Sequence, residues 1–481
     1  MMARMVAMMV VAGTTAVLGG CQPTVGNGVT PVEVMPSARR IIDDDGIVVP
    51  PGFRIEVAAR GLTYPTGIAF DGQGRPHVVE AGYAAGEDWT TPRLLRIEPD
   101  GSTTVVAEGG DGPWNGVVWH DGAFFVAQGG HLNGGAILRI AQDGTVRPLV
   151  EGLPSLGDHS TTGPVVGPDG WIYFGQGTTT NAGVVGEDSA RQGWLKRFPT
   201  VHDVPCRDVV LNGHNFTSTD PWHPGRMILT GAYSPFGIST RRGQTVAGRV
   251  PCGGAILRVS PQGGAPELVA WGLRNPYGLA FAADGQLYVT DHGYDRRGSR
   301  PVPQADDLLW RITADRWYGW PDYHGDRPLP ASDDGDGPIT APPPLLATPP
   351  GTPPPPLATL GAGAGAAGLD ISRDGAALGL QGKALVALEG PIGSRVVAVN
   401  LATGATENFA VNRDFDTNRA QERDSASWLE RIGFGRPVAV GVAPGGQSVY
   451  VVDFGTMTLN GRQESVRRRS GLLWRITKAT P

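Results

Sequence analysis

One pattern recurs six times along the chain and constrains its fold more than any other feature. Each copy has an apolar strand, a glycine-containing turn, a second apolar strand and then a polar residue shortly before glycine, as in "NPYGLAFAADGQLYVTDHG" (275–293). Two apolar runs joined by such a turn predict a β-hairpin. The six copies lie at 66–82, 115–130, 162–177, 275–293, 367–390 and 437–455.

A shorter apolar segment follows each hairpin, as in "AILRIAQDG" (136–144) or "GLLWRIT" (471–477). Hairpins that alternate with single strands at this scale indicate a repeat architecture. Antiparallel units repeated radially form a β-propeller. We therefore predict an all-β fold, a six-bladed β-propeller over residues 51–481. The pattern does not place a fourth strand in any blade.

Two segments interrupt the repeat. Residues 178–254 separate the third hairpin from its partner strand, and this insertion contains Cys206 and Cys252. We expect these two cysteines to form a disulfide, because cysteines of exported proteins commonly pair. The second segment, "APPPLLATPPGTPPPP" (341–356), cannot form a central strand and is predicted to be an exposed connector.

The N-terminus has the features of a targeting segment. Residues 1–20 combine an early arginine with an apolar stretch and small residues, which is typical of a secretory signal. The end of this segment, "LGGC", resembles the bacterial lipobox, so we expect Cys21 to be lipidated and 21–50 to act as a tether. The alternative is an ordinary signal peptide with an incidental cysteine. Either way we expect export, and with lipidation a membrane-anchored lipoprotein on the periplasmic side.

Charge gives no support to a nucleic-acid partner. The formal net charge is −6, and no basic run resembles a nucleic-acid footprint.

A polar residue ends the second strand of every hairpin, where an inner strand of a propeller would reach the channel mouth. The simplest interpretation is that each caps a turn. These residues are Glu80, Gln128, Gln176, Asp291, Glu389 and Asp453.

The loop after the fourth hairpin carries a more specific signal. "GLRNPYGLAF", "DGQLYVTDHGYD", "ADDLLWRI" and "WYGWP" follow one another between residues 272 and 321. Together they resemble the glucose/sorbosone dehydrogenase family, most nearly its sorbosone branch, and the resemblance extends from about Pro51 to Ile476. It implies a six-bladed propeller that uses pyrroloquinoline quinone (PQQ) and calcium to oxidise a sugar or a sugar-derived aldehyde or alcohol, with hydride transfer to the quinone. Because the chain has no C-x-x-C-H haem motif, we expect a separate electron acceptor.

The resemblance also implies residues that bind the cofactor. PQQ is a planar tricarboxylate, and guanidinium groups bind carboxylates in a bidentate manner. Arg274 and Arg436 each stand immediately before an inner hairpin, where loops converge on the channel mouth. Asn275 and His292 match family positions that contact the cofactor.

The metal ligands and the base follow from the same resemblance. The family's calcium ligands, two backbone carbonyls and one acid, correspond to Gly293, Tyr294 and Asp307; calcium prefers such oxygen donors. A family histidine that removes the substrate hydroxyl proton stands eight residues before the glycine of a G-P-D motif. His159 stands eight residues before Gly167, and we predict that it is the general base.

The chain departs from the glucose enzymes at three places. Thr178 stands where they carry an aspartate that orients the histidine, Leu308 stands where they carry glutamate, and 437–439 read Pro-Val-Ala where the family often has an acid or a second arginine. Two other functions stay open. One is a metal-dependent propeller lactonase or hydrolase that uses Glu80, Asp291 and Asp453. The other is a carbohydrate-binding propeller without catalysis.

Overall fold

The computed structural model describes most of the chain after the N-terminal segment. It covers residues 40, 42, 44–84, 88–129, 134–191, 193–330, 332–333, 338–372, 378–390, 394–413, 433–460 and 463–479. Cys21, the predicted signal peptide and most of the predicted tether lie outside the described residues.

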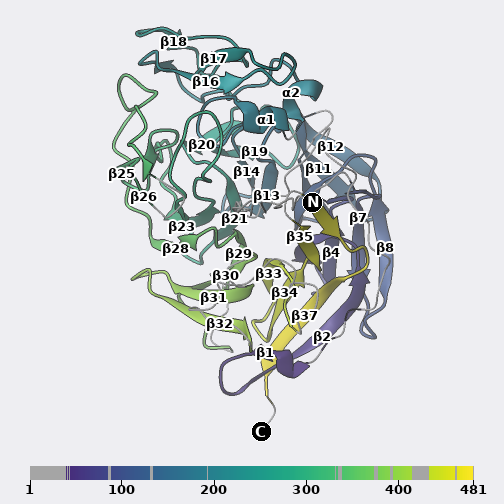
Figure 1. Cartoon of the computed structure of the whole chain (residues 1–481). Helices are drawn as coiled ribbons and strands as arrows, with labels where there is room; N and C mark the ends of the chain where they lie inside the picture. The colour runs from purple at the N-terminus through teal and green to yellow at the C-terminus, as the bar shows by residue number, and fades with distance from the viewer. Residues whose placement is uncertain are drawn as a thin grey trace, which may run out of the picture.

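Six antiparallel sheets follow one another around a central axis, so the predicted six-bladed β-propeller is confirmed (Figure 1). In each blade the two strands of a predicted hairpin come first, and the predicted single strand comes third. The first three blades are β3 (Pro65–Phe70), β4 (Pro76–Glu80), β7 (Arg93–Ile97) and β8 (Thr103–Glu108); β9 (Trp114–His120), β10 (Ala123–Gln128), β11 (Gly135–Ala141) and β12 (Val146–Leu153); and β13 (Thr161–Val166), β14 (Ile172–Gln176), β19 (Ala255–Val259) and β20 (Glu267–Trp271).

The last three blades complete the ring. They are β21 (Pro276–Phe281), β22 (Leu287–Asp291), β23 (Asp306–Arg311) and β28 (Ala358–Ala362); β29 (Ala366–Ile371), β30 (Lys383–Leu388), β31 (Arg395–Asn400) and β32 (Thr406–Asn412); and β33 (Pro437–Val442), β34 (Ser448–Asp453), β37 (Gly471–Lys478) and β2 (Phe53–Leu62). Strand β1 (Ile47–Val48) adds to the outer edge of β32. Short hairpins extend the loops as β5 (Tyr83–Ala84) with β6 (Asp88–Trp89), β24 (Tyr323–His324) with β25 (Arg327–Pro328), β26 (Ser332–Asp333) with β27 (Pro338–Ile339), and β35 (Met457–Asn460) with β36 (Gln463–Val466), and the turn η1 (Asp44–Gly46) precedes β1.

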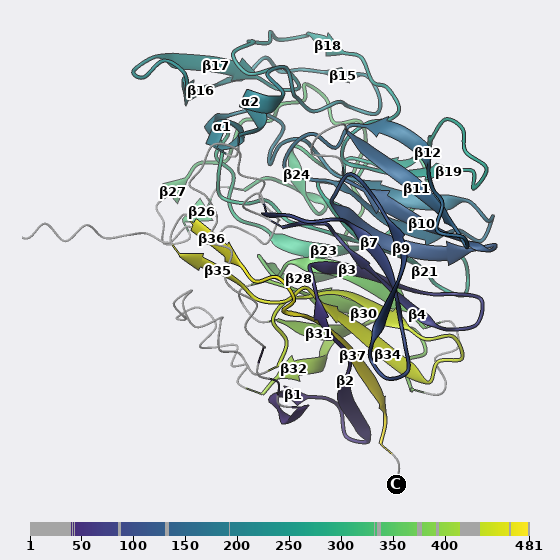
Figure 2. The same ribbon diagram turned by 90° about the vertical axis from the view of Figure 1, so that its right-hand side faces the viewer.

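The two ends of the chain close the ring in the sixth blade. Strand β2, near the N-terminus, pairs antiparallel with the last strand β37, from Phe53 opposite Lys478 to Leu62 opposite Gly471. Figure 2 shows the purple β2 lying beside the yellow β37. Because the chain runs on from β2 into β3 of the first blade, the pairing of β2 with β37 closes the ring of blades.

The core lies between the faces of neighbouring blades. Strand β22 is buried at all five positions, because a middle strand of a blade is covered on both faces. Trp310 and Trp474, fully buried in the fourth and sixth blades, direct their indole N–H groups toward the carboxylates of Asp291 and Asp453. Apolar packing thus extends to the polar strand ends at the channel.

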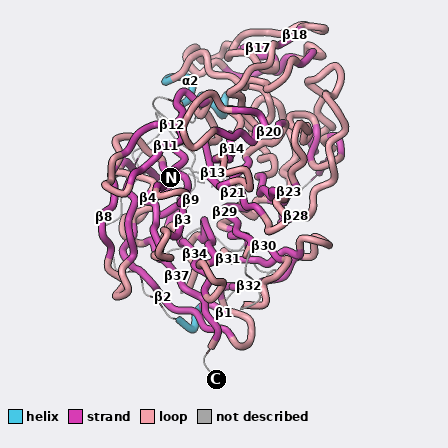
Figure 3. The backbone as a smooth tube through the Cα atoms, turned by 180° about the vertical axis from the view of Figure 1, so that it is seen from behind, coloured by secondary structure: helices cyan, strands magenta, loops and turns pink. Residues whose placement is uncertain are grey.

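The insertion after the third hairpin lies outside the ring of blades, in teal in Figures 1 and 2. It contains two short helices, a disulfide between Cys206 and Cys252, and two small sheets. Strands and loops make up almost all of the remainder, as Figure 3 shows. Within the described ranges no helix is long and apolar enough to cross a membrane. The elements are α1 (Glu187–Arg191), α2 (Trp194–Arg197), β15 (Val209–Val210), β16 (Asn215–Thr219), β17 (Met227–Gly231) and β18 (Thr245–Val246).

Most of the proline-rich segment 341–356 is exposed and forms no strand, but it also has a buried part. Leu345 and Leu346 are only 1% and 3% exposed. The carboxylate of Asp322 accepts hydrogen bonds from the backbone N–H groups of both leucines at 2.8 Å. This segment packs against the insertion, where Leu346 forms a bridge with Leu211. Its prolines exclude a regular strand, but its two leucines supply apolar surface to the core.

Candidate active site

The predicted catalytic and cofactor-binding residues come from loops at one end of the channel. His159 precedes β13, Arg274 and Asn275 precede β21, and His292 follows β22. A loop that enters a first strand and a loop that leaves a second strand lie at the same end of an antiparallel blade. The contacts described below show that the third and fourth blades meet there.

His159 is buried, with 1% of its surface exposed. Its Nδ1 lies 2.9 Å from both the carbonyl oxygen and the hydroxyl oxygen of Thr178. Because a carbonyl oxygen can only accept a hydrogen bond, Nδ1 carries the proton of the neutral ring. Nε2 therefore presents a lone pair, and this buried atom has no hydrogen-bond partner within the described structure.

The electrostatic surroundings keep the imidazole of His159 neutral. Burial is the main cause that holds its pKa well below the ordinary value of 6.5, and the positive charges of Arg274 and Arg297 lower it further. A neutral imidazole with a free, buried Nε2 is a proton acceptor. The position predicted for the general base therefore has the protonation state that such a base requires.

Arg274 lies beside this histidine, and its guanidinium group is paired within the protein. Its side chain donates to the carboxylate of Asp295 at 2.9 Å and to the amide oxygen of Asn181 at 2.8 Å. A further hydrogen bond of 3.2 Å reaches the backbone carbonyl of Asn181. The predicted clamp for a cofactor carboxylate is thus also a buried link between the loop before β21 and the loop after β22.

Arg297 is a site residue that the sequence did not single out. Its guanidinium group forms ion pairs with Asp158 at 2.6 Å, with Asp188 at 2.8 Å and with Asp295 at 3.3 Å. These carboxylates come from the residue before His159, from helix α1 and from the loop after β22. "YDRRGSR" holds three arginines without periodicity, so only the density of charge could have indicated a network there.

Asn275 and His292 join the fourth blade to the fifth. The amide of Asn275 donates to Nδ1 of His292 at 3.0 Å, so Nε2 of His292 donates to the carbonyl oxygen of Ala366 at 3.0 Å. The His292 ring stacks on Tyr277 with ring centres 5.6 Å apart. Oδ1 of Asn275 is buried and has no hydrogen-bond partner among the described residues.

Gly177 lies next to both residues that carry an unpartnered atom, His159 and Asn275. A Cβ at this position would lie 2.2 Å from Cβ of His159 and 3.0 Å from Oδ1 of Asn275. Any side chain would therefore separate the histidine from the amide. His159 and Asn275 flank the same glycine, and each offers a buried acceptor to a ligand that donates a hydrogen bond.

The predicted calcium ligands are also close together. The carboxylate of Asp307 accepts from the backbone N–H groups of Gly293 at 2.9 Å and Ala366 at 2.8 Å. The carbonyl oxygen of Tyr294 accepts from Ala305 N–H at 3.0 Å. This all-oxygen set suits calcium. Within the described residues, no cluster of three or more histidine, cysteine or acidic side chains is arranged to hold a metal, so calcium binding stays a prediction.

Arg436 lies at the boundary of the fifth and sixth blades. It forms a buried ion pair of 2.7 Å with Glu389. Burial raises the pKa of Glu389, while the charges of Arg436 and His292 lower it. Glu389 thus connects Arg436 electrostatically with the fourth-blade group, although no hydrogen bond in the described structure joins Arg436 to His159.

The carboxylates that a metal-dependent hydrolase would use are engaged by the backbone. Asp291 accepts from the N–H groups of Arg274 and Asn275 at 3.1 and 2.7 Å. Asp453 accepts likewise from the two residues before β33, and Glu80 accepts from Thr63 while pairing with an arginine. Asp291, Asp453 and Glu80 therefore all cap backbone turns, which is the simplest interpretation of these strand ends from the sequence.

These features define the class of molecule: a six-bladed propeller with a buried neutral histidine and an arginine–carboxylate network at one mouth of its channel. His159 and Asn275 each hold a buried acceptor atom without a partner in the described structure, and the guanidinium group of Arg274 pairs with Asp295 in the same group of loops. That arrangement is compatible with a cofactor that carries carboxylates, since arginine is the preferred partner of such groups.

Comparison with known proteins supports the predicted resemblance. Residues 245–342 match the family described as Glucose / Sorbosone dehydrogenase. Quinoprotein glucose dehydrogenase B of Acinetobacter calcoaceticus is 25% identical over 179 residues, which are 37% of this chain and 29% of that relative's length. The resemblance to the glucose/sorbosone dehydrogenase family is thereby confirmed; the sorbosone branch remains a prediction.

Solved structures share the fold. The PQQ-bound form of an aldose sugar dehydrogenase from Streptomyces coelicolor matches with a TM-score of 0.50 and 18% identity, over 89% of this chain and 99% of that one. The holo form of the pyranose dehydrogenase PQQ domain from Coprinopsis cinerea matches with a TM-score of 0.52 and 16% identity, over 94% and 99%. At these identities the likeness concerns the fold.

Proposed function

We propose that this protein is a PQQ- and calcium-dependent dehydrogenase of sugars or of sugar-derived aldehydes and alcohols, such as an aldose or sorbosone. The observation that carries the proposal is the buried, unpartnered Nε2 of a neutral His159 at the channel mouth. Support also comes from the matched family segment, which contains Arg274, Asn275, His292 and the predicted calcium ligands.

His159 acts as the general base in this proposal. Hydrogen bonding to Thr178 fixes the proton on Nδ1 and directs Nε2 away from that loop. Nε2 accepts the proton of the substrate hydroxyl group, or of an aldehyde hydrate, as the C–H bond at the same carbon breaks. The nearby positive charges disfavour an early protonation of the ring, so it stays ready to accept at neutral pH.

The other residues bind and orient. Arg274, Asn275, His292 and Arg436 would hold PQQ, whose carboxylates would share the guanidinium groups now paired with Asp295 and Glu389. The carbonyls of Gly293 and Tyr294 and the carboxylate of Asp307 would hold calcium. When bound, PQQ supplies an ortho-quinone that accepts a hydride from the substrate carbon, and calcium would act there as a Lewis acid.

A separate electron acceptor would complete the turnover. We also propose that the chain is exported and anchored by lipid at Cys21, on the basis of the N-terminal sequence. Mass spectrometry of the membrane fraction tests this anchor: an acylated N-terminal Cys21 is expected, and an unmodified mature chain that starts elsewhere would rule it out.

The activity itself is tested by aldose-dependent dye reduction after reconstitution with PQQ and calcium. We expect the wild type to be active only with both, and His159→Gln to lose turnover by about 10²–10⁴-fold, the usual contribution of a positioned base. His223→Gln is the matched control, because that imidazole is exposed and pairs with Asp220 in the insertion. Wild-type turnover in His159→Gln would exclude His159 as the base.

A further inference from the structure

Three consecutive threonines follow the third hairpin, and the first of them holds His159. Thr178, Thr179 and Thr180 are buried. The hydroxyl group of Thr178 donates to the carbonyl oxygen of Thr180 at 2.7 Å. Since a hydroxyl has a single hydrogen, this bond leaves its oxygen to accept from Nδ1–H of His159.

A carboxylate of the insertion holds the threonines in turn. One oxygen of Asp203 accepts from the backbone N–H of Thr179 at 2.7 Å and from that of Thr180 at 3.3 Å. The other oxygen accepts from the hydroxyl of Thr180 at 2.5 Å. Asp203 is 2% exposed, so water does not compete for these bonds. Its side chain therefore fixes the residue whose carbonyl orients the Thr178 hydroxyl.

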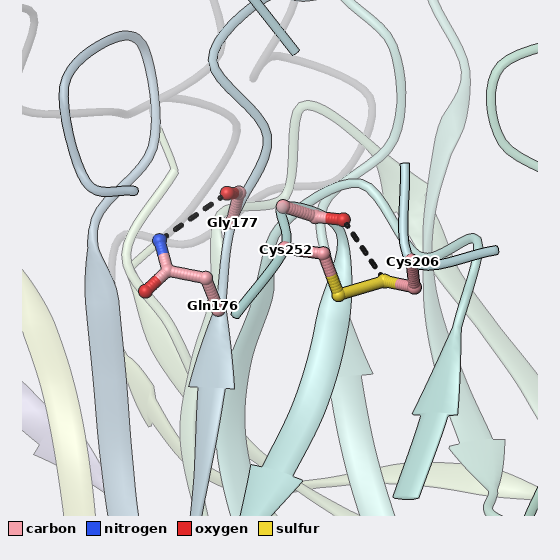
Figure 4. Close-up of a disulfide and its surroundings, with 5 residues drawn as sticks. Gln176, Gly177, Cys206 and Cys252 are labelled. Atoms are coloured by element: carbon pink, nitrogen blue, oxygen red, sulfur yellow. Dashed lines mark hydrogen bonds between the residues drawn. A yellow bond between two sulfur atoms is a disulfide. The ribbon is translucent and has the colours of Figure 1, made fainter. Parts of the chain in front are cut away.

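The disulfide anchors Asp203 beside this turn. Cys206 lies three residues after Asp203, and Gly253, which follows Cys252, donates its N–H to the carbonyl of Val204 at 3.1 Å. Figure 4 shows the disulfide close to Gly177 at the end of β14. Gly254, the residue after Gly253, packs against Thr178: a Cβ on Gly254 would lie 3.0 Å from the Thr178 side chain.

We propose that Asp203, a residue of the insertion beside the third blade, is a positioning residue for His159 that acts through Thr180 and Thr178. The inference rests on the proposed role of His159 as the base. The proposal explains how His159 is oriented although its direct partners, the carbonyl and hydroxyl oxygens of Thr178, carry no formal charge. A remote carboxylate organises the turn, and the turn presents two acceptors to Nδ1.

Another buried carboxylate of the insertion provides a matched control. Asp220 is 3% exposed and also caps a turn, accepting from the backbone N–H of Trp222 at 2.9 Å. Its side chain contacts His223 and not the threonine turn. Asp203→Ala and Asp220→Ala each remove a turn-capping carboxylate of the insertion, but only the first removes support from His159.

The decisive readout is the tautomer of His159, followed by ¹⁵N NMR of the histidine side chains in the full chain without PQQ. We expect wild type and Asp220→Ala to show protonated Nδ1 and unprotonated Nε2. Asp203→Ala should show a mixture of both tautomers. In the reconstituted protein, Asp203→Ala should lower kcat about tenfold, as loss of an orienting partner commonly does, with KM changed less than twofold.

Three further variants keep the proposal testable. If Asp203→Ala does not fold, Thr180→Val removes the hydroxyl that binds Asp203, and Thr178→Val against Thr178→Ser tests the last step, with rescue expected for serine. A folded Asp203→Ala or Thr180→Val protein with the wild-type tautomer would overturn the proposal. Because the tautomer is measured without cofactor, a wild type that never oxidises sugars would refute the proposed function and leave this result to be judged separately.

Discussion

Removing the Cys206–Cys252 disulfide should destabilise the protein by an amount that follows from its position. The two cysteines are 46 residues apart in sequence. Closing a loop of that size removes roughly 13 cal/mol/K of chain entropy from the unfolded state, which corresponds to about 4 kcal/mol at 25 °C. Both cysteines are buried in the native structure, so serine at these positions adds a small polar cost. The double variant Cys206→Ser/Cys252→Ser should therefore unfold with about 4 kcal/mol less free energy.

The assay is urea unfolding followed by the fluorescence of the protein's 12 tryptophans. The wild type unfolded in the presence of a thiol reductant is the internal control, and it should show the same loss as the double variant. Equal slopes with denaturant would indicate that both states are otherwise comparable. A loss below about 1 kcal/mol in both samples would refute the reasoning that loop closure stabilises this chain.

Two other predictions concern charge. Asp322→Ala should lower the free energy of unfolding by about 3–5 kcal/mol, because it leaves the buried Arg300 without its ion partner. Lys383→Ala removes one partner of the more exposed pair with Glu407 and should lower it by less than about 1 kcal/mol. Equal losses in the two variants would contradict the conclusion that the buried pair matters more than the exposed one. Burial holds the pKa of His159 well below its ordinary 6.5, so protonation favours the unfolded chain and stability falls as the pH drops below about 6.5. Urea unfolding from pH 7 to pH 5 should therefore show a smaller loss for His159→Gln than for the wild type, and parallel losses would show that His159 is not buried in its neutral form.

The blades could be predicted because their inner strands are covered on both faces. A strand such as β22 is buried at all five positions and begins with the apolar run Leu287–Val289 before its polar end, and this repeat is visible in the sequence. The outer strands could not be predicted in this way. Strand β8 exposes four of its six residues and β12 is also largely exposed, so neither requires an apolar run. Strand β2 is also hidden, because only three of its ten residues are buried and its partner β37 lies at the other end of the chain.

Part of the candidate site could be predicted for a similar reason. His159 and Thr178 flank one hairpin, so the register of β13 and β14 brings them together. Asp203 and Arg297 could not be found. Asp203 reaches the site through turns of the insertion that follow no period, and Arg297 joins carboxylates from three separate segments. Such contacts depend on tertiary packing that local sequence does not encode.

The central claim is that this propeller binds PQQ and oxidises a sugar with His159 as base, and a single-turnover titration tests it most directly. Stoichiometric PQQ and calcium are added to the wild type and to His159→Gln, binding is followed by the absorbance of the quinone, and an aldose is then added without an electron acceptor. The account predicts that both proteins bind PQQ and that the wild type reduces it at least about 10²-fold faster than the variant. Failure of the wild type to bind PQQ, or equal rates of reduction in both proteins, would contradict it.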